Sequence, residues 1–343
     1  MSDKSRVEWI DAARGIGIFL VVFGHVWRGL ASAGIIPISQ LFIAVDNAIY
    51  LFHMPLFFVL SGMFFERSAL NDNFAESLQK RSVTLIYPLV LWSYITAAFL
   101  LAAGSLTNRS QISLFDALTY PIPPKDIYWF LAALFIVQTL AWFAVRARTP
   151  IAYVIAFCVS AVLVYALDLT TLSVWVRNTV ENAPLFFLGL LLSRVPFQSR
   201  VLAAFGLMSF AAAEIWAVTW PDLLRAPLDF LPGLVATIGI VLGAASAWPA
   251  RVKVLGFIPA LGKASMTIYV SHIIALAAAR IALVKLGVTN PAVHILIGVS
   301  AGIVLPMAFH LIATRLGLMR LFGLGRDNSP FYFNRSARFP PTA

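Results

Sequence analysis

The sequence predicts an all-α protein, a polytopic transmembrane helix bundle of about ten spans with both termini in the cytoplasm. Composition points to this class, because 60% of the 343 residues are hydrophobic and only 12% are charged. A soluble domain carries about 25% charged residues. Apolar runs recur along the whole chain and approach, with their flanks, the roughly 20 residues that cross a bilayer; examples are Ile16–Val26, Leu85–Ala103, Ile151–Leu167 and Leu231–Ala247.

The expected spans are residues 10–31, 43–65, 83–104, 127–146, 150–168, 181–193, 201–220, 230–248, 264–284 and 292–314. Their order sorts the basic residues onto two sides, and the richer side is expected to be cytoplasmic. That side receives Lys4, Arg6, Arg67, Lys80, Arg81, Arg146, Arg148, Arg194, Arg200, Arg251, Lys253, Arg315, Arg320 and Arg326. The other side receives Arg28, Arg109, Lys125, Arg177, Arg225, Arg280 and Lys285.

Two divisions follow from these spans. Residues 1–320 form an integral membrane domain, and residues 321–343 form a short cytoplasmic tail rich in Arg, Pro and Gly. The net charge of +10 does not indicate nucleic acid as a partner, because the cations stand singly or in pairs between apolar runs. The expected surroundings are membrane lipid.

Ionisable residues inside spans are costly and are candidates for function. The first span contains Asp11, Arg14 and His25. Arg14 and His25 are eleven residues apart, which places them on one helix face about 16.5 Å apart along the axis. A structural alternative is a boundary salt bridge between Asp11 and Arg14, with His25 as a packing residue.

Other polar residues interrupt later spans. His53 precedes Pro55, and Ser61 follows one to two turns later; the proline frees a backbone carbonyl around which polar groups can gather. Ser265, Tyr269 and His272 share one face of the ninth span. Tyr128 and Trp129 open the fourth span, where aromatic residues are usually interfacial anchors. Glu214 and His310 also lie in spans and form a candidate pair, whereas His294 is interpreted as structural.

These residues suit an acid–base reaction near neutral pH. A neutral histidine is a good general base, and it could take the proton from an alcohol that attacks a thioester. Arg14, Lys80 and Arg81 lie towards the cytoplasmic side and suit the phosphates of a nucleotide-bearing donor. No metal site is expected, because the five histidines have no His-x₃-His spacing and there is one cysteine, Cys158.

The segment from Trp9 to His25 resembles the Arg-x₁₀-His signature of membrane-bound acyltransferase family 3, the glycan O-acyltransferases, with Arg14 and His25 in register. The resemblance is closest to the branch related to fucose 4-O-acetyltransferases. It extends over nearly the whole chain, through residues 52–62, 80–88, 128–131 and 261–272. One departure is Thr84, where the family often has a further arginine in a basic loop before the third span.

The resemblance implies transfer of an acetyl group, or another acyl group, from acyl-CoA to a hydroxyl of a sugar or glycan. It implies His25 as the essential residue and Arg14 as its partner, with Arg14, Lys80 and Arg81 binding the donor. Asp11, His53, Ser61, Tyr128, Trp129, Ser265, Tyr269 and His272 are expected to line the cavity or contact the acceptor. No permanently bound cofactor is expected, since acetyl-CoA would be a substrate.

A second function remains open from the residues alone. Intramembrane Asp, Glu and His side chains also form proton relays, so a transporter of a glycan intermediate or of a proton-coupled solute is the alternative. Acyl-CoA turnover by purified protein would separate the two. The expected location is the inner membrane of a bacterium.

Overall fold

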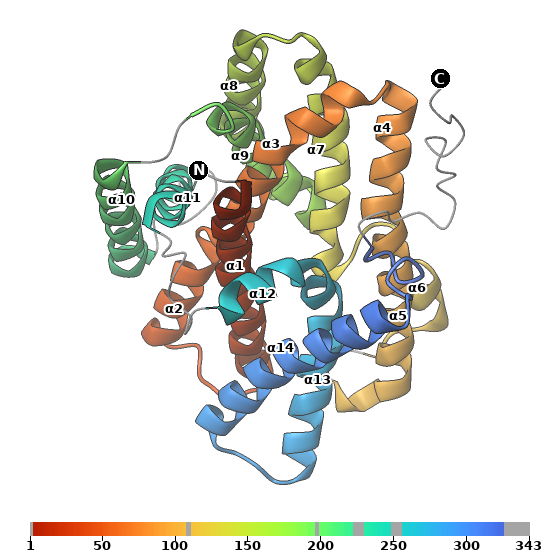
Figure 1. Ribbon diagram of the computed structural model, residues 1–343. Coiled ribbons are helices and arrows are strands. Elements are labelled where there is room, and N and C mark those ends of the chain that lie inside the picture. Colours follow the sequence, from red (N-terminus) through yellow and green to blue (C-terminus); the bar gives the residue numbers. More distant parts are fainter. Residues whose placement is uncertain (1–2, 108–110, 196–198, 222–229, 248–255, 326–343) are drawn as a thin grey trace.

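A computed structural model describes residues 3–107, 111–195, 199–221, 230–247 and 256–325 (Figure 1). Over these ranges the regular structure is helical, and no strand occurs in them. The helices are α1 (Asp3–Ser32), α2 (Gln40–Tyr50), α3 (His53–Asn71), α4 (Phe74–Arg81), α5 (Tyr87–Ala103), α6 (Leu114–Leu118), α7 (Trp129–Arg146), α8 (Pro150–Ala166), α9 (Val174–Leu192), α10 (Arg200–Thr219), α11 (Phe230–Ala247), α12 (Phe257–Lys263), α13 (Ser265–Lys285) and α14 (Pro291–Arg315). The expected all-α class is therefore confirmed.

Seven helical segments in these ranges are long and apolar enough to cross a membrane: Trp9–Ser32, Gln40–Asn71, Phe74–Leu106, Asp126–Arg146, Val201–Thr219, Ser265–Lys285 and Pro291–Arg315. Two shorter apolar helices cover Pro150–Ala166 and Phe230–Ala245. The helix α9 carries Arg177 and Glu181 and begins seven residues before the expected sixth span. Each expected span therefore overlaps one or two of these helices, while the count of ten spans stays a prediction.

The second expected span is interrupted between α2 and α3. Pro55 cannot donate a backbone hydrogen bond, so the carbonyl four residues earlier loses its helical partner. Next to it, the ring of His53 lies with Nδ1 2.6 Å from the carbonyl oxygen of Ile49. Because a carbonyl only accepts, Nδ1 carries the proton. The break thus turns His53 back onto the end of α2 and fixes its ring.

The polar segment after α3 is helical, which corrects the expectation of a basic loop before the third span. Asn73 and Glu76 form a reciprocal capping box that starts α4. A single π-helical turn, Ser82–Ile86, then joins α4 to α5. Lys80 and Arg81 consequently lie in the last turn of α4.

The helix α1 lies within the bundle and packs against α12, α14, α13, α3, α11 and α2 (Figure 1). The approach to α12 is close because it uses glycines: a Cβ on Gly262 would lie 1.7 Å from the carbonyl oxygen of Asp11, and one on Gly15 would lie 2.0 Å from that of Ile258. Small residues permit such contacts between helices in membranes. Gly15 and Gly262 thus let α1 and α12 approach backbone to backbone.

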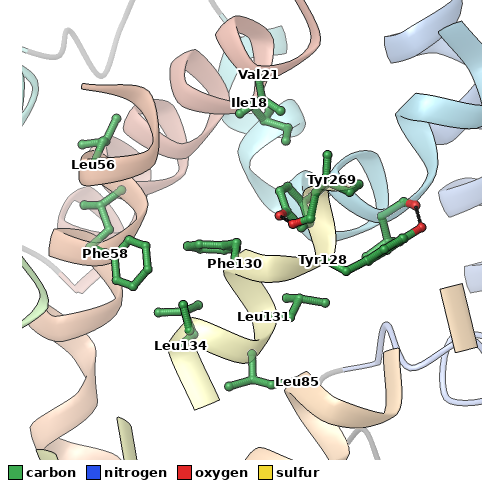
Figure 2. Close-up of a cluster of buried hydrophobic side chains, with 14 of the residues drawn as sticks. Ile18, Val21, Leu56, Phe58, Leu85, Tyr128, Phe130, Leu131, Leu134 and Tyr269 are labelled. Carbon is green, nitrogen blue, oxygen red and sulfur yellow. Dashed lines mark hydrogen bonds between the residues drawn. The ribbon is translucent and has the colours of Figure 1, made fainter. Parts of the chain in front are cut away.

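Aromatic residues join α3, α7 and α13 in the core. Phe130 of α7 meets Phe58 of α3 and Tyr269 of α13 edge-on, with ring centroids 5.2 and 5.3 Å apart (Figure 2). The hydroxyl of Tyr128 lies 2.7 Å from Thr96 Oγ1 and 3.2 Å from the carbonyl oxygen of Val270. These contacts fix α13 relative to α5 and α7 and so position the side chains that α13 presents.

The first residues of the expected tail pack onto the bundle. Tyr87 Oη donates to the carbonyl of Leu321 over 2.7 Å, and Trp92 Nε1 donates to that of Phe322 over 3.0 Å. The Phe322 ring also meets Phe309 at a centroid distance of 4.9 Å. The remainder of the expected tail, 326–343, lies outside the described residues.

Candidate active site

A cavity of about 570 Å³ lies between the C-terminal half of α1, the α2–α3 junction, the first turns of α7, α9 and α11, and α13. Thirteen residues with polar side chains or polar ring atoms contribute to its wall: His25, Arg28, Asp46, Asn47, Tyr50, His53, Asp126, Trp129, Arg177, Asn178, Glu181, Asn182 and Tyr269. In a bundle that is otherwise apolar, such a concentration of polar groups marks a functional site.

One wall of the cavity is a fixed cluster around Arg28. Its guanidinium donates to both carboxylate oxygens of Asp46, with Nε–Oδ1 2.6 Å and Nη2–Oδ2 2.7 Å. The same group lies over the Tyr50 ring, with Cζ 3.2 Å from the centroid. A bidentate ion pair combined with a cation–π contact restrains all three side chains. Tyr50 in turn meets His53 edge-on at 4.6 Å, which extends the cluster to α3.

Two amide side chains in the cavity wall have unused hydrogen-bonding capacity. Asn47 Nδ2 and Asn182 Oδ1 are buried and have no hydrogen-bond partner among the residues that the structure describes. Asn182 Nδ2 donates to the carbonyl of Asn178 over 2.8 Å, which fixes the direction of its Oδ1. Buried polar atoms are normally paired, so an unpaired donor and an unpaired acceptor suit a ligand that offers both. A hydroxyl group is such a ligand.

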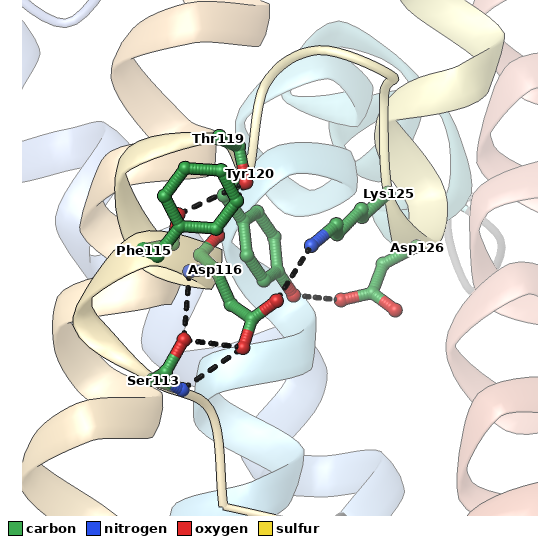
Figure 3. A network of polar contacts seen from close by, with 7 residues as sticks. All are labelled: Ser113, Phe115, Asp116, Thr119, Tyr120, Lys125 and Asp126. Atoms are coloured by element: carbon green, nitrogen blue, oxygen red, sulfur yellow. Dashed lines mark hydrogen bonds and ion pairs between the residues drawn. The ribbon is translucent and has the colours of Figure 1, made fainter.

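Asp126 brings a carboxylate to the cavity from the loop before α7. It accepts a hydrogen bond from Tyr120 Oη, and its backbone φ is +54°, a left-handed conformation that Asp tolerates better than most residues (Figure 3). Next to it, Lys125 Nζ lies 3.9 Å from Asp116 Oδ1. Hydrogen bonds from the Ser113 side chain and backbone hold the pKa of Asp116 below its ordinary value. The loop is therefore organised by charged contacts at the rim of the site.

His25 lies between two aromatic neighbours. Its ring centroid is 6.4 Å from that of Tyr50 and 5.2 Å from that of His272. His25 is partly exposed and lines the cavity, whereas His272 is fully buried behind it. A histidine that reaches the cavity with a second histidine behind it has the arrangement of a base with a supporting residue.

Arg14 and Arg81 meet a second part of α3. The Arg14 guanidinium lies 5.8 Å from the Phe64 ring centroid, and that of Arg81 lies 4.5 Å from the adjacent Phe65. Arg81 also donates to Ser77, and Lys80 pairs with Asp72. Phe64 is eleven residues beyond His53 on α3, as Arg14 is eleven residues before His25 on α1. The two antiparallel helices α1 and α3 thus carry His25 and His53 at one end, and the contacts with arginine lie at the other end.

The expected site residues therefore divide into two groups. The cavity wall includes His25, His53, Trp129 and Tyr269, and it does not include Arg14, Lys80, Arg81, Asp11, Ser61, Tyr128, Ser265 or His272. Within the second group, Tyr128 is buried with its hydroxyl bonded between helices, and His272 reaches the site through His25. His310 shares a hydrogen bond with Thr267 over 2.8 Å rather than with Glu214. His294 is fixed by Val288, as expected of a structural residue.

Sequence reasoning missed much of the polar wall. Arg28 lies one turn after His25, and Asn178, Glu181 and Asn182 share a face of α9 at helical spacing. That spacing was a usable signal, but the expected sixth span began at residue 181 and left the first turns of α9 in a loop. Among the described residues, no group of three or more His, Cys, Asp and Glu side chains has an arrangement that could hold a metal ion.

The fold and the cavity define a multi-pass membrane protein with a histidine in a polar pocket. Residues 7–311 match the family model of the acyltransferase domain, Acyl_transf_3. The chain therefore belongs to acyltransferase family 3.

Two curated relatives support this placement, and both are named nodulation protein NolL. The relative from Mesorhizobium japonicum is 33% identical over 132 residues, which are 37% of this chain and 32% of the relative. The relative from Sinorhizobium fredii is 28% identical over 200 residues, 56% of this chain and 50% of the relative. The chain thus spans a third to a half of the length of these relatives. No solved structure matches the chain significantly.

Proposed function

We propose that the chain is an integral membrane O-acyltransferase that moves an acetyl, or another acyl, group from acyl-CoA to a hydroxyl of a sugar or glycan. Membership in acyltransferase family 3 supports the reaction type. The observation that carries the proposal is the presence of His25 in a polar cavity whose wall leaves Asn47 Nδ2 and Asn182 Oδ1 without partners. Sugar hydroxyls both donate and accept, so a sugar carries groups that suit each of these atoms.

The cavity is the proposed acceptor site. Trp129, which lies nearly parallel to Phe58 at a centroid distance of 6.3 Å, offers a fixed aromatic surface in the cavity wall. Arg28 pairs with Asp46 and Arg177 with Glu181, and Asp126 adds one more carboxylate to the wall, so its charges nearly balance. A nearly balanced, hydrogen-bonding pocket with aromatic surface favours an uncharged hydroxylated ring over a strongly charged ligand.

The proposed donor site lies around Arg14, Lys80 and Arg81. Guanidinium groups bind phosphates by charge-assisted hydrogen bonds. Arg14 and Arg81 contact adjacent residues of α3, which brings the two cations to one part of the bundle. A donor whose phosphates lie there would direct its thioester along α1 towards His25, about 16.5 Å away along the helix axis. The two substrates would then meet at His25 from opposite ends.

In the proposed reaction, His25 takes the proton from the acceptor hydroxyl as its oxygen attacks the thioester carbonyl. The new C–O bond forms, the C–S bond breaks, and the histidinium returns the proton to the leaving sulfur of CoA. Protons and electrons balance without a metal or redox partner. The acyl group passes directly between the substrates, and His25 ends in its starting state.

The proposed orientation places both termini in the cytoplasm, with ten spans in the inner membrane of a bacterium. The excess of basic residues on the side of Arg14 and Arg81 supports this. Acyl-CoA would then bind from the cytoplasm, and the mouth of the cavity would face the opposite side. Such an arrangement would let a cytoplasmic donor modify a glycan outside.

The test is acyl transfer by the detergent-purified chain. [¹⁴C]acetyl-CoA is incubated with glycans extracted from the source cell envelope, and labelled glycan and released CoA are both quantified. The proposal predicts labelled glycan that mild alkali releases as acetate, as expected of an ester. If proteoliposomes move glycan or protons while acetyl-CoA stays intact, the chain is a transporter and the proposal is wrong.

A further inference from the structure

The tautomer of His272 follows from its hydrogen bonds. Its Nδ1 lies 2.7 Å from the carbonyl oxygen of Tyr269 and 3.0 Å from that of Ile268, both in its own helix α13. Carbonyl oxygens only accept, so Nδ1 must carry a proton and donate it. In the neutral ring, Nε2 is then an acceptor with a lone pair.

This acceptor has no partner in the described structure. His272 is 0% exposed, and its Nε2 is buried without a hydrogen bond. Native proteins rarely leave a buried side-chain acceptor unpaired, and such atoms often mark a catalytic role. The helix α13 packs against α1, so the helix that carries His25 lies beside it.

The separation of the two imidazole rings suits a hydrogen bond between them. Their centroids are 5.2 Å apart and the rings are inclined by 50°. A hydrogen bond of about 3 Å with one ring radius on each side requires a centroid distance close to this value. The distance therefore permits such a bond once the His25 ring turns a nitrogen towards Nε2 of His272, and catalytic hydrogen bonds often tighten in this way only when substrate binds.

We propose that His272 is a positioning residue whose Nε2 accepts the N–H of one His25 ring nitrogen and directs the other nitrogen into the cavity. This inference rests on the proposed role of His25 as the base. The lone pair of His25 is then presented to the acceptor hydroxyl in one tautomer and one orientation, as a carboxylate does for the histidine of a catalytic triad. Because the His272 ring is neutral, it orients His25 without adding a charge to an apolar surrounding.

The variants follow from this geometry. His272→Gln keeps an acceptor oxygen near the position of Nε2, whereas His272→Leu removes it. His294 offers a matched control. It is also buried, donates from Nε2 to the carbonyl of Val288 over 2.8 Å, and has no partner for Nδ1 among the described residues, yet it belongs to α14 and not to the helix that brings His272 against His25. His294→Leu thus measures the effect of losing a buried polar group from a span, and His272→Leu adds to it the loss of the residue that supports His25.

The experiment is a double-mutant cycle on the purified full-length chain. His272→Leu should lower kcat roughly 10- to 100-fold, the usual loss when a residue that orients a functional histidine is removed, with the KM of both substrates within threefold. His272→Gln should recover at least a third of the lost activity, and His294→Leu should keep kcat within twofold. Because His25 and His272 act as a unit, adding His272→Leu to His25→Ala should cost nothing further.

A measurement without substrates separates this inference from the proposed function. Carbethoxylation of His25 by diethyl pyrocarbonate, followed by peptide mass spectrometry, reports the reactivity of its lone pair. A hydrogen-bonded partner raises the basicity of a histidine, so His272→Leu should slow labelling severalfold and His272→Gln should restore much of the rate. Unchanged labelling, or a loss of kcat that is equal in the wild-type and His25→Ala backgrounds, would overturn the inference even if acyl transfer is established.

Discussion

The Arg28 guanidinium lies over the Tyr50 ring, with Cζ 3.2 Å from the centroid, while its two donors hold Asp46. Arg28 belongs to α1 and the other two residues to α2. The contact therefore ties the helix that carries His25 to the short helix that ends beside His53. It also shapes the cavity wall opposite α9, where the acceptor is proposed to bind.

Replacing Arg28 with Lys should impair acceptor binding more than the chemical step. Lysine keeps the charge but loses the planar, two-pronged contact with Asp46 and the stacking on Tyr50. We expect the acceptor KM to rise roughly tenfold with kcat changed less than threefold, the pattern of a binding contact that is equally strong in ground and transition state. Steady-state kinetics at saturating acetyl-CoA measure this. A selective fall in kcat would instead place Arg28 in the chemical step.

The close contact between α1 and α12 should not tolerate a methyl group. Gly262→Ala would place a Cβ 1.7 Å from the carbonyl oxygen of Asp11, and backbone cannot move aside as a flexible side chain can. We expect a loss of about 1–3 kcal/mol, typical of overpacking, seen as a lower Tm in detergent. Gly29→Ala is the control, because its only close neighbour is the end of the Arg280 side chain at 3.3 Å. Equal Tm values for the two variants would contradict the packing.

Removing the charge of Arg81 should weaken donor binding. Arg81 is only 6% exposed, so Gln is a safer replacement than an acidic residue, which would bury an uncompensated charge. We expect the KM for acetyl-CoA to rise roughly tenfold, as a charge-assisted contact to phosphate contributes about 1.5–3 kcal/mol. Arg315→Gln, on an exposed part of the same side, controls for general charge. A donor KM equal to that of wild type would remove Arg81 from the donor site.

The proposed orientation predicts which loops face outward. In a Cys158→Ser background, which removes the exposed native thiol, single cysteines replace Leu118 between α5 and α7 or Val195 after α9. Both positions are exposed, at 62% and 44%. A membrane-impermeant maleimide added to intact spheroplasts should label position 118 and leave 195 unlabelled until the membrane is opened. The reverse labelling pattern would mean that the chain is inserted in the opposite orientation, with the donor and acceptor sides exchanged.

The helices could be predicted because each apolar run is long enough to define one element, whereas their interruptions could not. Pro55 is visible in the sequence, but it does not specify that α2 ends at Tyr50 and that α3 begins at His53, whose ring bonds the Ile49 carbonyl. The π-helical turn at Ser82–Ile86 has no comparable local signal. Through this π-helical turn, the segment that the sequence predicts as a loop runs as continuous helix from α4 into α5.

The site was predictable only where spacing along one helix carries the information. Arg14 and His25 are on one helix, so their register follows from the helical repeat. The pairing of Arg28 with Asp46, the buried acceptor of His272 beside His25, and the amides of Asn47 and Asn182 arise between helices. No periodicity within one segment specifies such contacts, because they depend on how the helices pack.

The central claim is that His25 is the catalytic base, and one paired measurement on purified His25→Ala tests it most directly. Thermal stability and acetyl transfer are measured on the same preparation. We predict a Tm close to that of the wild type, because His25 is partly exposed to the cavity, and a kcat lower by roughly 10²–10⁴-fold, the usual share of general-base catalysis. A stable His25→Ala protein with nearly wild-type turnover would contradict the account.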